Sequence, residues 1–256
     1  MSLSHALLIL LAGMGAGTIN TIVGSGSLIT FPTLLFLGYP PIAANVSNNI
    51  GLVPGGVAGS LGYRRELAGQ GDFIRRAAPL SFLGAAVGAV LLLRLPAAAF
   101  AAIVPVLVLI GLLLVVFGPK LQRAAQSAHT DGPRPGWHRW ALGVGIFAAG
   151  VYGGYFGAAQ GVLLMGILSV LSTEPLQRLN GYKNVLSTVV NAVAAVIFLL
   201  IAPGEIRWPV VGLIALGATI GGLLGARIGR RMPPTVLRAV IVIIGVVAII
   251  KLVWFS

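Results

Sequence analysis

Long apolar runs separated by short polar segments dominate this chain. An α-helix needs about 20 mostly apolar residues to cross the hydrocarbon core of a bilayer. Runs close to this length predict six transmembrane helices, over residues 43–61, 77–95, 97–117, 184–201, 208–226 and 237–255. The pattern therefore predicts an all-α polytopic integral membrane protein.

Two further apolar regions, 5–38 and 140–172, are too long for one crossing and too short for two comfortable ones. Each is interrupted near its middle. The first break is Gly24–Ser27, and the second contains Gly153, Gly154 and Gly157. Glycine and serine are poor residues for a helix interior. We therefore expect two broken helical hairpins, which either turn back within the membrane or cross twice with short, tilted helices.

The two breaks suggest an internal repeat, since Gly24 and Gly157 are 133 residues apart (157 − 24 = 133). Gly84-Ala85 and Gly217-Ala218 match at the same offset, and an asparagine pair matches at an offset of 135. We expect two repeats, 1–117 and 140–256, each with one hairpin and three spans, joined by a cytoplasmic linker, 118–139. An odd number of full crossings per repeat would invert the second, an arrangement typical of secondary transporters.

Composition and charge support a membrane protein. Charged residues make up 9% of the chain and the mean hydropathy is +1.00, whereas a soluble domain carries roughly 25% charged residues. The net charge of +12 comes from basic residues in the short loops. With the N-terminus outside, 14 of the 17 Lys and Arg lie in or beside inside loops, as the positive-inside rule requires. We expect a multi-pass protein of the bacterial inner membrane with both termini outside, and no nucleic-acid partner.

The expected spans hold few residues suited to acid–base or metal chemistry. The five carboxylates (Glu66, Asp72, Asp131, Glu174 and Glu205) and the three histidines all fall in expected loops or near span ends, and there is no cysteine. Proton and sodium transporters commonly carry a mid-membrane carboxylate, and a membrane protease or metal site needs a base or ligands at depth. We therefore expect no enzyme activity, cofactor or metal, although sodium held by carbonyls and hydroxyls stays open.

Neutral hydrogen-bonding residues gather instead around the two breaks. A helix that begins after a break points its free N–H groups and the positive end of its dipole at the break, which favours an anion. Capping, interhelical hydrogen bonds and tight packing are the alternatives, and Lys183 is expected near the inner mouth. The predicted substrate-binding residues are Asn20, Gly24, Ser25, Gly26, Ser27, Asn45, Asn49, Tyr152, Tyr155, Gly157, Gln160, Asn180, Lys183 and Asn184.

Three segments, AGTINTIVGSGSLITFPTLLFLGYPPIAANVSNN, GVYGGYFGAAQGVLLMGIL and LNGYKNVLSTVVNA, resemble the TauE/SafE sulfite exporter family of membrane anion transporters, and the resemblance covers essentially the whole chain. It implies transport of sulfite, sulfonates, related sulfur oxyanions or other small organic anions. We expect an exporter that works by alternating access. The alternatives are an importer of a sulfur oxyanion or small organic acid, and a membrane-embedded assembly factor without transport. The expected partners are a small anionic substrate and the lipid bilayer; a homodimer is compatible with the sequence.

Overall fold

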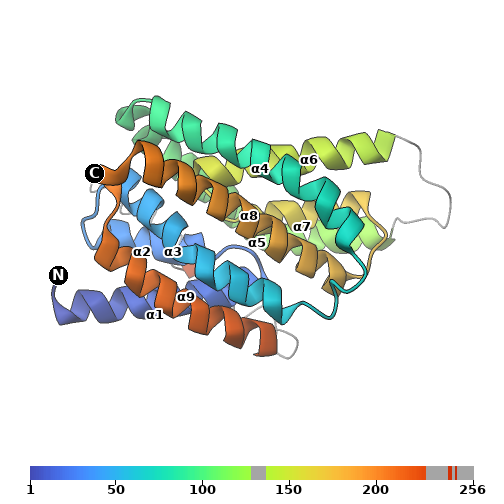
Figure 1. The fold of residues 1–256 in the computed structure, drawn as a ribbon, viewed down its shortest axis with the longest axis horizontal. Coiled ribbons are helices and arrows are strands. Elements are labelled where there is room, and N and C mark those ends of the chain that lie inside the picture. Colours follow the sequence, from blue (N-terminus) through green and yellow to red (C-terminus); the bar gives the residue numbers. More distant parts are fainter. Residues whose placement is uncertain (128–136, 229–241, 244–245, 247–256) are drawn as a thin grey trace.

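The computed structural model describes residues 1–127, 137–228, 242, 243 and 246, and in this part of the chain helices are joined by turns, without a strand. The predicted span 237–255 lies almost entirely outside the described residues. The elements are α1 Leu3–Ile22, α2 Ser27–Phe36, α3 Pro41–Gly62, α4 Gly71–Arg94, α5 Ala97–Ser127, α6 Trp137–Tyr155, α7 Gln160–Leu171, α8 Leu176–Ile201, the 3₁₀ helix η1 Pro203–Glu205 and α9 Trp208–Ile228 (Figure 1).

Five of these helices are long and apolar enough to cross a membrane: α1, α4, the Ala98–Gly118 part of α5, α8 and α9. Their outer faces carry large exposed apolar side chains, such as Leu83, Leu109 and Leu200, which suit a hydrocarbon surrounding. Helix α3 has span length, 22 residues, but buries Asn45, Asn48 and Asn49. The prediction of an all-α polytopic membrane protein is confirmed.

Both predicted hairpins exist, and each has one long and one short leg. The 20-residue α1 is followed by the 10-residue α2, and the 19-residue α6 by the 12-residue α7. At 1.5 Å per residue, a helix of 10 to 12 residues reaches only about half the thickness of the hydrocarbon core. The short legs therefore favour hairpins that turn back within the membrane over hairpins that cross twice.

Several helices extend beyond the apolar runs that predicted them. Helix α4 begins at Gly71 rather than at 77, α8 begins at Leu176 rather than at 184, and α5 continues to Ser127 into the expected linker. The added segments are rich in Arg, Lys, Gln, Ala and Leu, which are strong helix formers. Hydropathy reports only the membrane-embedded part of such a helix, and residues 118–127 and 137–139 of the expected linker are helical.

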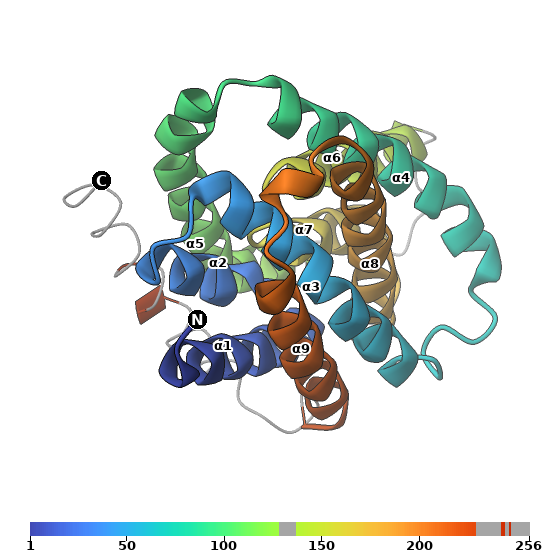
Figure 2. The ribbon, with the colours of Figure 1, turned by 60° about the vertical axis from the view of Figure 1, so that its left-hand side comes forward.

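The long hairpin legs pack against helices of the other half of the chain. Helix α1 lies along α9, and α6 lies along α4 (Figure 2). Glycines permit this close approach, because a Cβ on Gly17 would collide with the backbone of Ala218, and a Cβ on Gly154 with that of Ala85. Small residues at crossing points are how membrane helices pack without a hydrophobic driving force.

These contacts correct one of the repeat matches. Gly84 faces the Phe147 and Val151 backbones, while Gly221 faces the Met14 and Thr18 backbones. Phe147 and Val151 are the residues 133 positions after Met14 and Thr18, so the packing pairs Gly84 with Gly221 (221 − 84 = 137) and not with Gly217. The sequence match was wrong by one helical turn, because small residues recur every four positions in both helices. The inverted orientation of the two halves stays a prediction.

Candidate functional site

The two helix breaks have the same local geometry. The N–H groups of Val23 and Gly24 both donate to the Ile19 carbonyl, at 2.7 and 3.1 Å, and φ of Gly24 is +91°. In the second break, the N–H groups of Phe156 and Gly157 donate to the Tyr152 carbonyl at 2.9 and 3.2 Å, and φ of Gly157 is +77°. A glycine of positive φ that closes the last turn is a common way to end a helix. The glycines therefore terminate α1 and α6 at equivalent points.

The breaks also touch each other. The Gly161 N–H donates to the Gly24 carbonyl at 2.9 Å, and a Cβ on Gly24 would lie 2.5 Å from the Gly161 Cα. Real Cβ atoms do not approach other atoms so closely, so this contact requires glycine on both sides. The first turn of α7 is thereby joined to the turn between α1 and α2, backbone to backbone.

The turn before α2 presents a run of free backbone donors. Within the described chain, the N–H groups of Ser25, Gly26 and Ser27 donate to no backbone carbonyl, nor do those of Ala158 and Ala159 before α7. Ala159 holds a left-handed φ of +59°, a conformation that costs a non-glycine residue free energy. Consecutive free N–H groups at a helix start form an anion-attracting concavity.

Three polar side-chain atoms at the breaks are buried without a hydrogen-bond partner among the described residues. Ser25 is 1% exposed and Gln160 is 3% exposed; Ser25 Oγ, Gln160 Nε2 and Tyr155 Oη each lack a partner among the described residues. An unsatisfied buried donor costs about 1–3 kcal/mol. Such groups, gathered at one place, indicate a ligand site.

Other predicted site residues already have hydrogen-bond or packing partners within the protein. Ser27 Oγ accepts a hydrogen bond from Asn48 Nδ2 at 3.1 Å, and Asn48 Oδ1 accepts one from Thr30. Tyr152 Oη donates to the Ala158 carbonyl at 2.5 Å. Gly26 packs against α1 beside Asn20. The geometry assigns these residues to holding the breaks in shape.

Two asparagines cap the long hairpin legs across the two halves. Asn45 Nδ2 donates to the Tyr155 carbonyl at 3.1 Å, and Asn180 Nδ2 donates to the Ile22 carbonyl at 3.4 Å and to Tyr63 Oη at 2.9 Å. Asn45 lies 135 residues before Asn180, and Ile22 lies 133 residues before Tyr155, so the bonds are equivalent. Of the roles considered for these asparagines, interhelical capping describes the Nδ2 groups of both. Their Oδ1 atoms, like that of Asn49, have no partner among the described residues.

Asn45→Ala is expected to destabilise the fold more than Asn180→Ala. Asn45 is 1% exposed, so its loss leaves the Tyr155 carbonyl unpaired in a buried place, a cost of about 1–3 kcal/mol. The bond from Asn180 to Ile22 is longer and its loss should cost less. Thermal unfolding in detergent measures the difference; an equal or reversed order would contradict the assigned caps.

Lys183 is the buried basic residue of the site. Its side chain is 1% exposed, and Nζ donates to the Asn20 and Thr21 carbonyls at 3.0 Å each. Asn184 Nδ2 donates to the same Thr21 carbonyl at 3.1 Å. The described ion pairs, Arg75–Asp72 and Arg178–Glu174, do not involve Lys183. Lys183 was expected near the inner mouth; the structure buries its side chain inside the bundle, where it reaches the end of α1.

Sequence reasoning left four residues out of the site that the structure places in it: Thr30, Asn48, Tyr63 and Gly161. Asn48 carried a usable signal, since the offset of 135 that relates the asparagine pairs also relates Asn48 to Lys183. Tyr63 and Gly161 carried none, because one is a loop tyrosine and the other is one of 36 glycines.

Comparison with known proteins agrees with this architecture. The family model described as "Sulfite exporter TauE/SafE" matches residues 9–252. A "probable membrane transporter protein" of Haemophilus influenzae is 29% identical over 94% of this chain and 92% of the relative. The "probable membrane transporter protein YfcA" of Escherichia coli is 27% identical over 95% of this chain and 87% of the relative. No solved structure matches. The chain therefore belongs to the TauE/SafE family of membrane transporters.

Proposed function

We propose that this transporter carries a small anion, a sulfur oxyanion such as sulfite or a sulfonate, and binds it where the two helix breaks meet. The proposal rests on one observation: the buried Lys183 amino group lies at the end of α1 without a carboxylate partner among the described residues. A buried charge is costly unless it is paired. An anion seated at the break would supply the missing negative charge.

The hydrogen-bonding groups at the breaks match an oxyanion. The free N–H groups of Ser25, Gly26 and Ser27, the Ser25 hydroxyl and the Gln160 amide nitrogen are all donors without a partner within the described residues. Every oxygen of an ionised sulfite or sulfonate is an acceptor, and bonds from neutral donors to charged oxygens are stronger than neutral pairs. The anion needs no metal or cofactor in this arrangement.

Burial of the site favours alternating access. Ser25, Gln160 and Lys183 are each 3% exposed or less, so substrate can enter only when helices move. The contact of Gly24 with Gly161 lies between the two hairpins and offers a place about which the halves can rock. Inverted repeats with broken helices at the substrate site are the usual construction of such transporters.

Export is the expected direction, with import of the same anions or of a small organic acid as the alternative. A monovalent anion that leaves a negative-inside cell gains roughly 2.3 kcal/mol per 100 mV, so no coupling ion is needed. Proteoliposomes loaded with sulfite test this with an imposed potassium diffusion potential. Efflux should rise with inside-negative potential. Flux that ignores the potential and follows a sodium gradient would contradict the proposal and point to a sodium site on free carbonyl oxygens.

Ser25→Ala is expected to weaken anion binding by about tenfold or more, because a hydrogen bond to a charged group contributes about 1.5–3 kcal/mol. Gln160→Ala should have a smaller effect, since α7 already uses its Gly161 N–H to bind Gly24. Ser27→Ala is the control, because the Ser27 hydroxyl accepts a hydrogen bond from Asn48. This variant should lose more stability than anion affinity. Equilibrium binding of sulfite to the purified variants ranks them, and equal effects of Ser25→Ala and Gln160→Ala would refute the ranking.

A further inference from the structure

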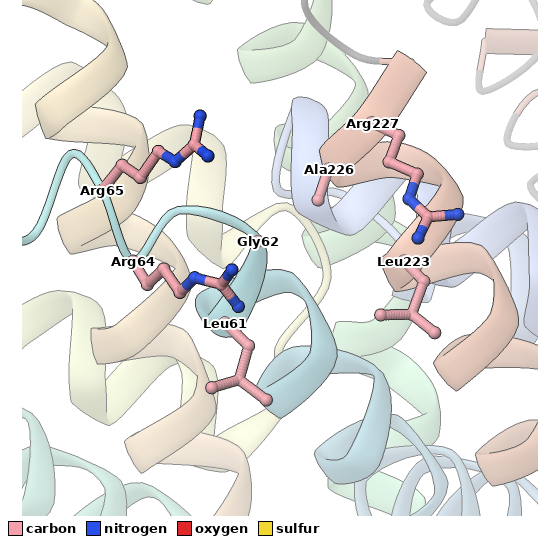
Figure 3. Close-up of a pocket in the computed structure, with 7 residues that line it drawn as sticks. All are labelled: Leu61, Gly62, Arg64, Arg65, Leu223, Ala226 and Arg227. Atoms are coloured by element: carbon pink, nitrogen blue, oxygen red, sulfur yellow. The ribbon is translucent and has the colours of Figure 1, made fainter.

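A second basic site lies away from the breaks, between the C-terminal ends of α3 and α9. A cavity of about 560 Å³ is bordered there by Arg64 and Arg65, from the turn after α3, and by Arg227, from the last turn of α9. Figure 3 shows the arginines reaching from the two sides of the opening. Gly62 and Ala226 bring the two helix ends into contact at its base. None of the residues assigned to the helix breaks takes part.

The three guanidinium groups have no carboxylate partner among the described residues. The ion pairs of this part of the chain are Arg75–Asp72 and Arg178–Glu174, and neither involves the cavity. Three like charges around one cavity raise the positive potential there, which attracts an anion. Guanidinium groups are well suited to phosphate, since their planar donors bind its oxygens in pairs.

The apolar part of the lining distinguishes between possible anions. Leu61 and Leu223 border the cavity, in the last turns of α3 and α9, and are 58% and 48% exposed. In a membrane these side chains face acyl chains, while the arginines lie at the level of the headgroups. A free oxyanion makes no favourable contact with these apolar side chains. A phospholipid joins a phosphate to acyl chains in one molecule, so it can occupy both parts.

We propose that this cavity binds the headgroup of an anionic phospholipid, with the phosphate among Arg64, Arg65 and Arg227 and an acyl chain along Leu61 and Leu223. The positive-inside distribution predicts that both helix ends face the cytoplasm, where basic pockets between membrane helices bind anionic headgroups. The bound lipid would join α3 to α9 at the cytoplasmic ends of the two halves.

Native mass spectrometry of the purified protein with added phosphatidylglycerol or phosphatidylcholine tests the proposal. The wild-type chain should retain phosphatidylglycerol in preference to phosphatidylcholine. The triple variant Arg64→Gln, Arg65→Gln, Arg227→Gln should lose that retention by about tenfold or more, because each arginine near a headgroup contributes attraction.

A matched control removes the same charge from the same predicted membrane side. Arg75→Gln, Arg76→Gln, Arg139→Gln changes three arginines outside the cavity and should keep the preference for phosphatidylglycerol. Equal loss in both triple variants would overturn the proposal in favour of unspecific charge attraction. Equal retention of the two lipids by the wild-type chain would overturn it without reference to any variant. Displacement of bound lipid by millimolar inorganic phosphate or sulfite would instead identify a vestibule for free anions, which also overturns it.

Discussion

Lys183→Met is expected to abolish anion binding and transport. If the anion neutralises the Lys183 ammonium, the variant loses one member of a buried ion pair, a cost of about 3–5 kcal/mol, or more than about 100-fold in affinity. The folded state should survive, because methionine fills a similar volume with an apolar chain. Equilibrium binding and proteoliposome flux of sulfite measure the loss.

Asn184→Ala is the matched control for this variant. Asn184 and Lys183 both donate to the Thr21 carbonyl, so both variants remove a capping bond from the end of α1, but only Lys183→Met removes a charge. Asn184→Ala should lower the unfolding temperature and retain most of the affinity. If Lys183→Met and Asn184→Ala reduce binding alike, Lys183 is a helix cap and its charge plays no part in binding.

Gly24→Ala is expected to disrupt the contact between the two breaks. The new Cβ would lie 2.5 Å from the Gly161 Cα, on a residue whose φ is +91°. Overpacking costs about 1–3 kcal/mol or more, and a left-handed φ adds about 1–2 kcal/mol for a residue with a Cβ. We expect loss of transport together with a large fall in stability, measured by flux and by thermal unfolding.

Two further glycine variants separate these causes. Gly38 also has a positive φ, +85°, but a Cβ there would meet nothing within 4 Å, so Gly38→Ala reports the backbone cost alone. Gly161→Ala adds the clash with Gly24 on a residue of ordinary helical φ. Transport should be lost in Gly161→Ala and kept in Gly38→Ala. The reverse result would show that the contact between the breaks is dispensable.

The sequence predicted the elements of this fold better than their packing. Apolar runs located the helices, and the glycines at 24 and 157 located both breaks, because a positive φ in a helical run is a local property of glycine. The sequence match between α4 and α9 differs by four residues from the offset that their packing shows. Glycine and alanine recur once per turn in both helices, so matches one turn apart look alike. The pairing of Gly24 with Gly161 depends on the tertiary fold and had no local signal.

The sequence pointed to the two breaks as the candidate site, but it did not indicate which hydrogen bonds the residues there make. Ser25 and Ser27 look equivalent in the sequence, yet Asn48 binds only Ser27 and leaves the Ser25 hydroxyl without a partner among the described residues. Asn45 and Asn180 were expected either to bind substrate or to cap helices, and their donors cap the opposite half. Lys183 looked peripheral because the expected span begins at 184, just after it. The helix begins at Leu176 instead, and the long side chain carries the Lys183 amino group to the end of α1.

Ser25→Cys offers the most direct test of an anion bound between the two breaks. The chain has no cysteine, so the variant carries a single thiol at the proposed site, and labelling by N-ethylmaleimide reports access to it. Ethanesulfonate or sulfate, which do not react with maleimides, should slow the labelling in a saturable manner, while chloride at equal ionic strength should not. Labelling of the introduced thiol at the same rate with and without ethanesulfonate or sulfate would contradict binding at the breaks.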